Sequence, residues 1–344
     1  SAIMEFEGVG IGESDFKMLR MQNCYFIDKS MYIKDIIDND SKVVLVTRPR
    51  RFGKTLNMSM LKYFFDCDSK DSKELFKGLK IMEQGEKYTS QMGAYPCLYL
   101  TLKDVNDSNY DNMILNLKTA IMRMFGEHRY LLDSDKIYAD EKEKINDVLF
   151  ARINEAMLKT SVLEISGYLN RHFSKPVMLF IDEYDVPIQA TYINGYYEKA
   201  INFLKSFFGA TFKDNPYLKK TVLTGVSRVA KESIFSGANN FDVYTVLDNE
   251  FADDFGITSE EVEKALKDFG VEDQKEEVKR WYDGYRIGDV EEIYNPWSLL
   301  NFLAKKRFVP YWVNTSSNDL IKLTMKNSVS VKEKMERLLK GEAI

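Results

Sequence analysis

Short apolar runs recur along the first two-thirds of the chain and predict buried strands. They occupy 43–47, 98–102, 177–181 and 221–226. Each run is continuous, without alternating polar residues, which is typical of parallel strands that are covered on both faces of a sheet.

The segments between these runs carry apolar residues at helical spacing. The clearest face is formed by Met113, Leu117, Ala120, Ile121 and Met124. A second helical pattern runs over 56–65. Strands that alternate with helices predict an α/β fold in which helices flank a parallel sheet. In such folds ligands bind beyond the carboxyl ends of the strands.

The pattern changes towards the C-terminus, where strand-like runs fade and helical faces take over. The clearest of these faces is formed by Val262, Ala265, Leu266 and Phe269. Thr258 or Ser259 can cap the first of these helices, and Pro296 suits the first turn of another. We therefore expect an α/β domain over 1–249 and a smaller, mainly helical domain over 250–344.

Composition narrows the class of protein. Hydrophobic residues make up 44% and charged residues 29% of the 344 positions, with a formal net charge of -5. Neither a basic nor an acidic tail is present, so charge gives nucleic-acid binding no support. No apolar run reaches signal-peptide length, and none approaches the roughly 18 residues of a membrane span. We expect a cytoplasmic protein without a membrane partner.

Cysteine and histidine usage excludes several kinds of site. The three cysteines, Cys24, Cys67 and Cys97, lie far apart without metal-ligand spacing, which favours a reducing compartment. His128 and His172 are isolated from each other in the sequence. A zinc site or a Ser-His-Asp triad is therefore not expected.

The strongest chemical signal is Arg-Pro-Arg-Arg-Phe-Gly-Lys-Thr at 48–55, between a predicted strand and an amphipathic helix. This is the context of a phosphate-binding P-loop. There, Lys54 reaches the terminal phosphates, the Thr55 hydroxyl ligates magnesium, and backbone N–H groups cradle phosphate oxygens. Gly53 permits close backbone approach, while Arg48 replaces the first glycine of the usual pattern. The alternative is a basic surface turn that precedes a helix.

All residues of the loop are candidate nucleotide ligands: Arg48, Pro49, Arg50, Arg51, Phe52, Gly53, Lys54 and Thr55. Arg50 and Arg51 fit two roles, as phosphate ligands or as members of ion pairs within the loop.

Two acids end the third apolar run, in Val-Met-Leu-Phe-Ile-Asp-Glu at 177–183. This is the Walker B arrangement, in which Asp182 holds magnesium and Glu183 orients or deprotonates the attacking water. Paired acids after a strand also begin ordinary turns, but the P-loop upstream favours the first interpretation. Asp185 is interpreted as a supporting or structural acid.

The fourth run ends in Thr-Gly-Val-Ser-Arg at 224–228. If this strand lies between the two motif strands, Thr224 at its end can touch the γ-phosphate as a sensor. Arg228 fits two roles equally: a side chain that reaches the same charge, or a solvated loop arginine.

These motifs, taken together, resemble the bacterial and archaeal AAA-ATPase-like family. The resemblance covers nearly the whole chain and rests on the segments 26–30, 47–55, 181–185, 224–228, 236–240, 281–285 and 294–298. Longer members of that family carry a C-terminal PD-(D/E)XK-type nuclease domain.

The resemblance implies that Arg48 is a family feature of the loop and that the ligands are ATP and magnesium. Asp28 and Lys29 match the segment that in related ATPases lies near the nucleotide base. The resemblance also implies that the part after Asn249 is a helical or winged-helix-like lid, and that the nuclease domain of longer relatives is missing from this sequence. A downstream nuclease domain or another protein is then a possible partner.

Three functions remain open on these grounds. The first is an ATPase that couples hydrolysis to movement of the lid and of a partner domain. The second is a nucleotide-gated switch that hydrolyses little. The third is the ATPase part of a nucleic-acid-processing protein.

Overall fold

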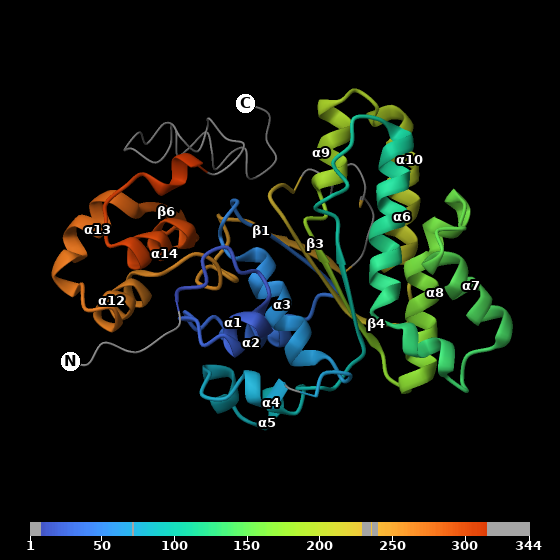
Figure 1. Cartoon of the computed structure of the whole chain (residues 1–344), viewed down its shortest axis with the longest axis horizontal. Coiled ribbons are helices and arrows are strands. Elements are labelled where there is room, and N and C mark those ends of the chain that lie inside the picture. Colours follow the sequence, from blue (N-terminus) through green and yellow to red (C-terminus); the bar gives the residue numbers. More distant parts are fainter. Residues whose placement is uncertain (1–7, 71, 229–234, 236–239, 315–344) are drawn as a thin grey trace.

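A five-stranded parallel sheet lies at the centre of the protein (Figure 1). The computed structural model describes residues 8–70, 72–228, 235 and 240–314. The strands are β1 (Val43–Thr47), β2 (Cys97–Thr101), β3 (Val177–Asp182), β4 (Leu218–Gly225) and β5 (Phe241–Tyr244). Their order is β2-β3-β4-β1-β5. Strand β4 therefore lies between the strands that precede the two motifs.

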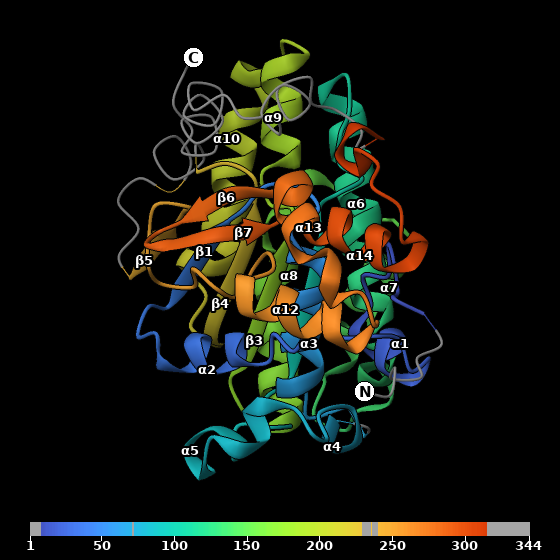
Figure 2. The same ribbon diagram turned by 90° about the vertical axis from the view of Figure 1, so that its left-hand side faces the viewer.

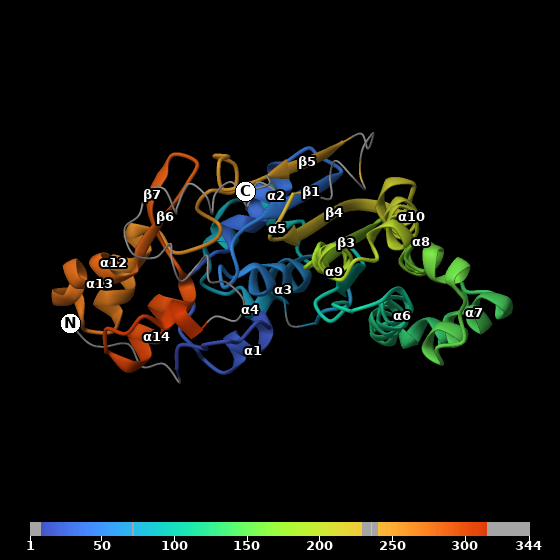
Figure 3. The ribbon, with the colours of Figure 1, turned by 90° about the horizontal axis from the view of Figure 1, so that it is seen from above.

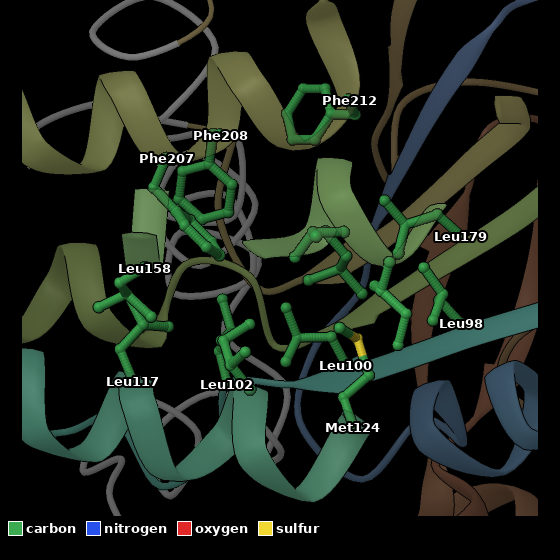
Figure 4. Packing of buried hydrophobic residues seen from close by; sticks show 14 of the residues in the cluster. Leu98, Leu100, Leu102, Leu117, Met124, Leu158, Leu179, Phe207, Phe208 and Phe212 are labelled. Carbon is green, nitrogen blue, oxygen red and sulfur yellow. The ribbon is translucent and has the colours of Figure 1, made fainter. Parts of the chain in front are cut away.

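Successive residues of each strand point to opposite faces of the sheet, which explains why the runs are apolar throughout. Val43 and Leu45 of β1 belong to one buried cluster, while Val44 and Val46 belong to another. Figure 4 shows the first cluster, where side chains of β2 and β3 such as Leu100 and Leu179 meet aromatic and aliphatic side chains of the covering helices.

Helices cover both faces (Figure 3). Helices α1 (Phe16–Met21), α2 (Met31–Asp38) and α3 (Lys54–Phe65) pack on one face. Helices α6 (Tyr110–Gly126), α8 (Glu155–Phe173) and α10 (Tyr197–Phe208) pack on the other. The other α-helices described in this part are α4 (Ser72–Leu75), α5 (Glu86–Thr89), α7 (Ala139–Leu149) and α9 (Val186–Ile193). Within the described ranges, none of the helices combines the length and apolarity that a membrane span requires.

Residues 257–312 form a further body with its own core, here called the C-terminal unit. Its elements are α12 (Ser259–Asp268), α13 (Lys275–Tyr282), β6 (Asp283–Ile287), β7 (Val290–Tyr294) and α14 (Pro296–Lys305). Its buried cluster also takes in Val9, Tyr25 and Phe52 from the first part of the chain. Figure 2 shows the unit in front of α3 and β1.

The expected α/β architecture is confirmed, and the four expected strands correspond to β1 to β4 with small shifts at their ends. Thr258 caps α12 through a capping box, and Asn295 caps α14 with Pro296 in its first turn. Strand β5 and the antiparallel hairpin β6–β7 were not expected. Both contain charged or polar residues on a partly exposed face, so their runs are not continuously apolar.

Candidate functional site

The loop at 48–53 connects β1 to the first turn of α3. Gly53 occupies the N-cap position of α3 with φ 81°, a left-handed conformation that side chains rarely adopt. A Cβ at this position would meet no heavy atom within 4 Å, so the backbone conformation accounts for the glycine. The unpaired N–H groups and partial positive charge of the α3 N-terminus are suited to an anion.

Lys54, the first residue of α3, is only 7% exposed. Its ammonium donates to the carbonyl oxygens of Arg48 at 2.9 Å and Pro49 at 2.8 Å. An ammonium has three donors, so one more acceptor can be bound. Burial lowers the pKa of Lys54 to about 8, against the opposing charge of Asp182. The side chain is a buried cation at neutral pH.

Three oxygen-bearing side chains converge from α3, β3 and β4. The Thr55 hydroxyl donates to one carboxylate oxygen of Asp182 at 2.6 Å, and the Thr224 hydroxyl donates to the other at 2.7 Å. Asp182 and Thr224 are buried, and Thr55 is half-buried. Carboxylate and hydroxyl oxygens beside a helix N-terminus are donors that Mg²⁺ accepts, so the residues present fit this ion.

Glu183 directly follows β3 with φ 53°, in the left-handed region. Strained backbone of this kind often marks a functional position. Its half-buried side chain lines the same cavity as Lys54 and Thr55. Burial, and then the neighbouring charge of Asp182, raise the pKa of Glu183. A carboxylate with a raised pKa is a stronger proton acceptor than an ordinary glutamate.

A cavity of about 360 Å³ opens over the loop. Its wall combines residues from 9–29, the loop at 48–53, Glu183 and the C-terminal unit. The apolar part of the wall includes Val9, Phe26, Ile27, Ile257 and Trp297. Small-molecule sites have this size and composition, with apolar walls and a few polar groups. One end thus offers a cation and a helix N-terminus, while apolar and aromatic side chains form much of the remaining wall.

Asp28 and Lys29 are adjacent in the sequence, but their side chains contact different parts of the protein. The Asp28 carboxylate accepts from the backbone N–H of Ser30 at 2.8 Å and of Lys80 at 2.9 Å, which ties α2 to the segment after α4. Lys29 lines the cavity, but its ammonium donates to Glu261 at 2.6 Å and to the carbonyl of Asp253.

The loop residues before Gly53 point in different directions. Arg48 is completely buried and bonds to backbone carbonyls. Arg50 and Arg51 are exposed and line the cavity. The buried Phe52 also lines the cavity and belongs to the core of the C-terminal unit.

Arg228 directly follows Val226 and Ser227, which are hydrogen-bonded to the two residues after Glu183. The Asp185 carboxylate accepts from the backbone N–H of Val226 at 3.0 Å and Ser227 at 2.8 Å, and the Tyr184 hydroxyl donates to the Ser227 carbonyl. Arg228 is half-buried, and among the residues that the structure describes it is not part of the cavity wall.

Sequence reasoning missed the cavity wall outside the motifs, above all Trp297 and Asp254. Trp297 lies in the segment 294–298, which was interpreted only as a helix start and a point of resemblance. Its ring lies beneath the guanidinium of Arg51, 4.3 Å from the ring centre. An aromatic residue in the first turn of a capped helix was the available signal.

Comparison with known proteins adds a family and one relative. The family described as "Predicted AAA-ATPase" has a model that matches residues 10–235. A curated relative from Azotobacter chroococcum mcd 1, "Uncharacterized protein in vnfD 5'region", is 26% identical over 314 residues. The alignment covers 89% of this chain and 54% of the relative. The chain thus spans about half the length of the curated relative it matches.

Proposed function

Because this chain belongs to the family of predicted AAA-ATPases, we propose that it binds ATP with magnesium over the loop at 48–55 and hydrolyses the bond between the β- and γ-phosphates, releasing ADP and phosphate. One observation carries the proposal: Asp182 accepts from both Thr55 and Thr224 beside the buried cation of Lys54. The family match supports the nucleotide, and this arrangement supports the assignment of roles.

Each role follows from position. Lys54 and the N–H groups of α3 bind the β- and γ-phosphates, and Thr55 with Asp182 holds the metal. Mg²⁺ bound there would offset phosphate charge during transfer. Glu183 accepts a proton from the attacking water, and Thr224 holds Asp182 in position and senses the γ-phosphate. Arg50 and Arg51 add positive charge at the rim of the cavity.

The wall that the C-terminal unit contributes supports a lid function. Ile257 and Trp297 face the same cavity as Lys54, so movement of the unit changes access to the nucleotide. Two helices followed by a hairpin are compatible with a winged-helix-like lid. A further domain or another protein is the proposed receiver of that movement.

A nucleotide-gated switch with little hydrolysis is the second candidate. The position of Arg228 favours it, since this arginine is not among the described residues of the cavity wall. An arginine aimed at the transition-state charge accelerates phosphoryl transfer by about 10³ to 10⁵. Without one, bound ATP persists and serves as a signal.

Single-turnover hydrolysis of ATP by wild type and Glu183→Gln tests the proposal. General base catalysis contributes about 10² to 10⁴ in rate, so Glu183→Gln is expected to bind ATP and to lose hydrolysis by that factor. Equal turnover in the two proteins would remove Glu183 from the catalytic role. The same assay with DNA separates the functions: acceleration by DNA would favour a nucleic-acid-processing role, and slow turnover in both conditions favours the switch.

A further inference from the structure

The loop at 48–53, here called the phosphate loop, makes several contacts that phosphate binding does not require. Arg48, Arg51 and Phe52 contact the C-terminal unit or the segment that leads into it. These three residues all precede Gly53 in the loop. The contacts suggest a second task for the loop.

Arg48 links the end of β1 to the segment before the C-terminal unit. Its guanidinium donates to the carbonyl of Thr47 at 2.8 Å and to that of Phe251 at 2.9 Å, and it lies 5.4 Å from the ring centre of Phe255. Phe251 has φ 62°, which is unusual for a bulky residue and must be held by its surroundings. The bond from Arg48 is one of those restraints.

Phe52 is inserted into the core of the C-terminal unit. Its side chain is 1% exposed and meets the ring of Tyr285 edge-on at 4.8 Å. A Cβ at Gly256 would lie 3.0 Å from the Phe52 ring and 2.6 Å from Ile293, so the glycine permits this insertion. Burial of an aromatic ring stabilises the folded state by several times the thermal energy. The Phe52 ring therefore helps to hold the loop against the C-terminal unit.

Two polar side chains, Asn57 and Lys29, tie neighbouring elements to the segment before the C-terminal unit and to α12. Asn57 on α3 donates to the carbonyl of Asp254 at 2.8 Å. Lys29 donates to the carbonyl of Asp253 at 2.7 Å and to Glu261, which completes the capping box of α12. The C-terminal unit is therefore held by the loop and by the elements on either side of β1.

We propose that the phosphate loop is also the joint that positions the C-terminal unit, with Arg48 and Phe52 as positioning residues. The inference rests on the proposed function in one respect, namely that a nucleotide binds at Lys54. Lys54 donates to the carbonyl of Arg48, so a phosphate that draws on this ammonium acts on the residue whose guanidinium holds Phe251. Nucleotide binding is thus coupled to the C-terminal unit through the loop itself.

Backbone hydrogen exchange of the full chain without nucleotide tests the joint. Tyr285→Leu removes the ring partner of Phe52 and is expected to speed exchange of the hydrogen-bonded amides of α3, from Asn57 onward, by about tenfold, within the usual range of coupling between sites. Phe302→Leu is the matched control, since this ring is buried in the same core and is not part of the cavity wall. It should speed exchange in α14 but not in α3.

An unchanged α3 in Tyr285→Leu would overturn the joint, and so would an equal effect of Phe302→Leu, which would mean general unfolding. A second arm adds Mg-ATP to wild type and Arg48→Lys, because lysine lacks the planar fork of donors with which the guanidinium reaches the carbonyls of Thr47 and Phe251. Slower exchange is expected at 43–65 in both proteins and at 257–305 in wild type alone.

The outcomes of the second arm separate the two proposals. If Mg-ATP slows exchange at 43–65 but not at 257–305 of wild type, coupling is rejected and nucleotide binding stands. If it slows neither region, nucleotide binding at the loop is rejected, while the first arm still decides whether the loop is a joint. Equal protection of 257–305 in Arg48→Lys would remove Arg48 from the coupling.

Discussion

At the scale of single residues, the chemistry of Lys54 depends on its burial. Its pKa is lowered to about 8, so the cation that we propose binds phosphate is lost as pH rises through that value. We expect the affinity for Mg-ATP to be level below pH 8 and to fall by up to about tenfold per pH unit above it. Lys54→Arg should remove this dependence because arginine stays charged. Calorimetric titrations between pH 6.5 and about 9.5 measure it, and a level wild-type profile would argue against phosphate binding by Lys54.

Asp182 differs from Asp185 in what its carboxylate holds. Asp182 accepts from two hydroxyls, whereas Asp185 accepts from backbone N–H groups of the loop after β4. Asp182→Asn should therefore raise the magnesium concentration needed for hydrolysis by about tenfold or more. Asp185→Asn should reduce turnover without changing the magnesium requirement. A magnesium titration of both variants distinguishes a metal ligand from a structural acid, and equal requirements would refute the assignment.

At the scale of elements, the end of β4 depends on close packing with the residues after β3. A Cβ at Gly225 would lie 2.6 Å from the Tyr184 ring and 2.8 Å from Asp185. Gly225→Ala is expected to cost about 1–3 kcal/mol of stability and to slow hydrolysis by displacing Thr224 and Asp182. Gly209→Ala is the control, because no heavy atom lies within 4 Å of its added Cβ. Thermal unfolding compares the two, and an unaffected Gly225→Ala would show that the packing is not restrictive.

The elements also show how far sequence reasoning reaches. Continuous apolar runs located β1 to β4, and the strand-loop-helix context placed Lys54 at the start of α3. The hairpin β6–β7 was not predicted, because charged residues occupy its exposed face and interrupt the apolar pattern. Arg48 was grouped with the nucleotide ligands because the sequence shows its neighbours in the loop but not the carbonyl of Phe251, which lies 203 positions away. Contacts of that kind depend on tertiary packing and leave no local pattern.

At the scale of the whole molecule, the part built on the parallel sheet and the C-terminal unit meet at one cavity. The larger part supplies Lys54, Thr55 and Glu183, and the C-terminal unit supplies Ile257 and Trp297. Phe52 belongs to the phosphate loop and also to the buried cluster of the C-terminal unit. This arrangement supports the proposed coupling between nucleotide binding and the position of the C-terminal unit.

The central claim is that this cavity binds ATP through Lys54, and isothermal titration of the full chain with Mg-ATP tests it most directly. Removal of a buried charge partner costs about 2–5 kcal/mol, so Lys54→Ala should bind at least roughly 30-fold more weakly than wild type. Lys62→Ala, on the same helix but outside the cavity wall, should bind like wild type. Equal affinities for wild type and Lys54→Ala, or no measurable binding by wild type, would contradict the account.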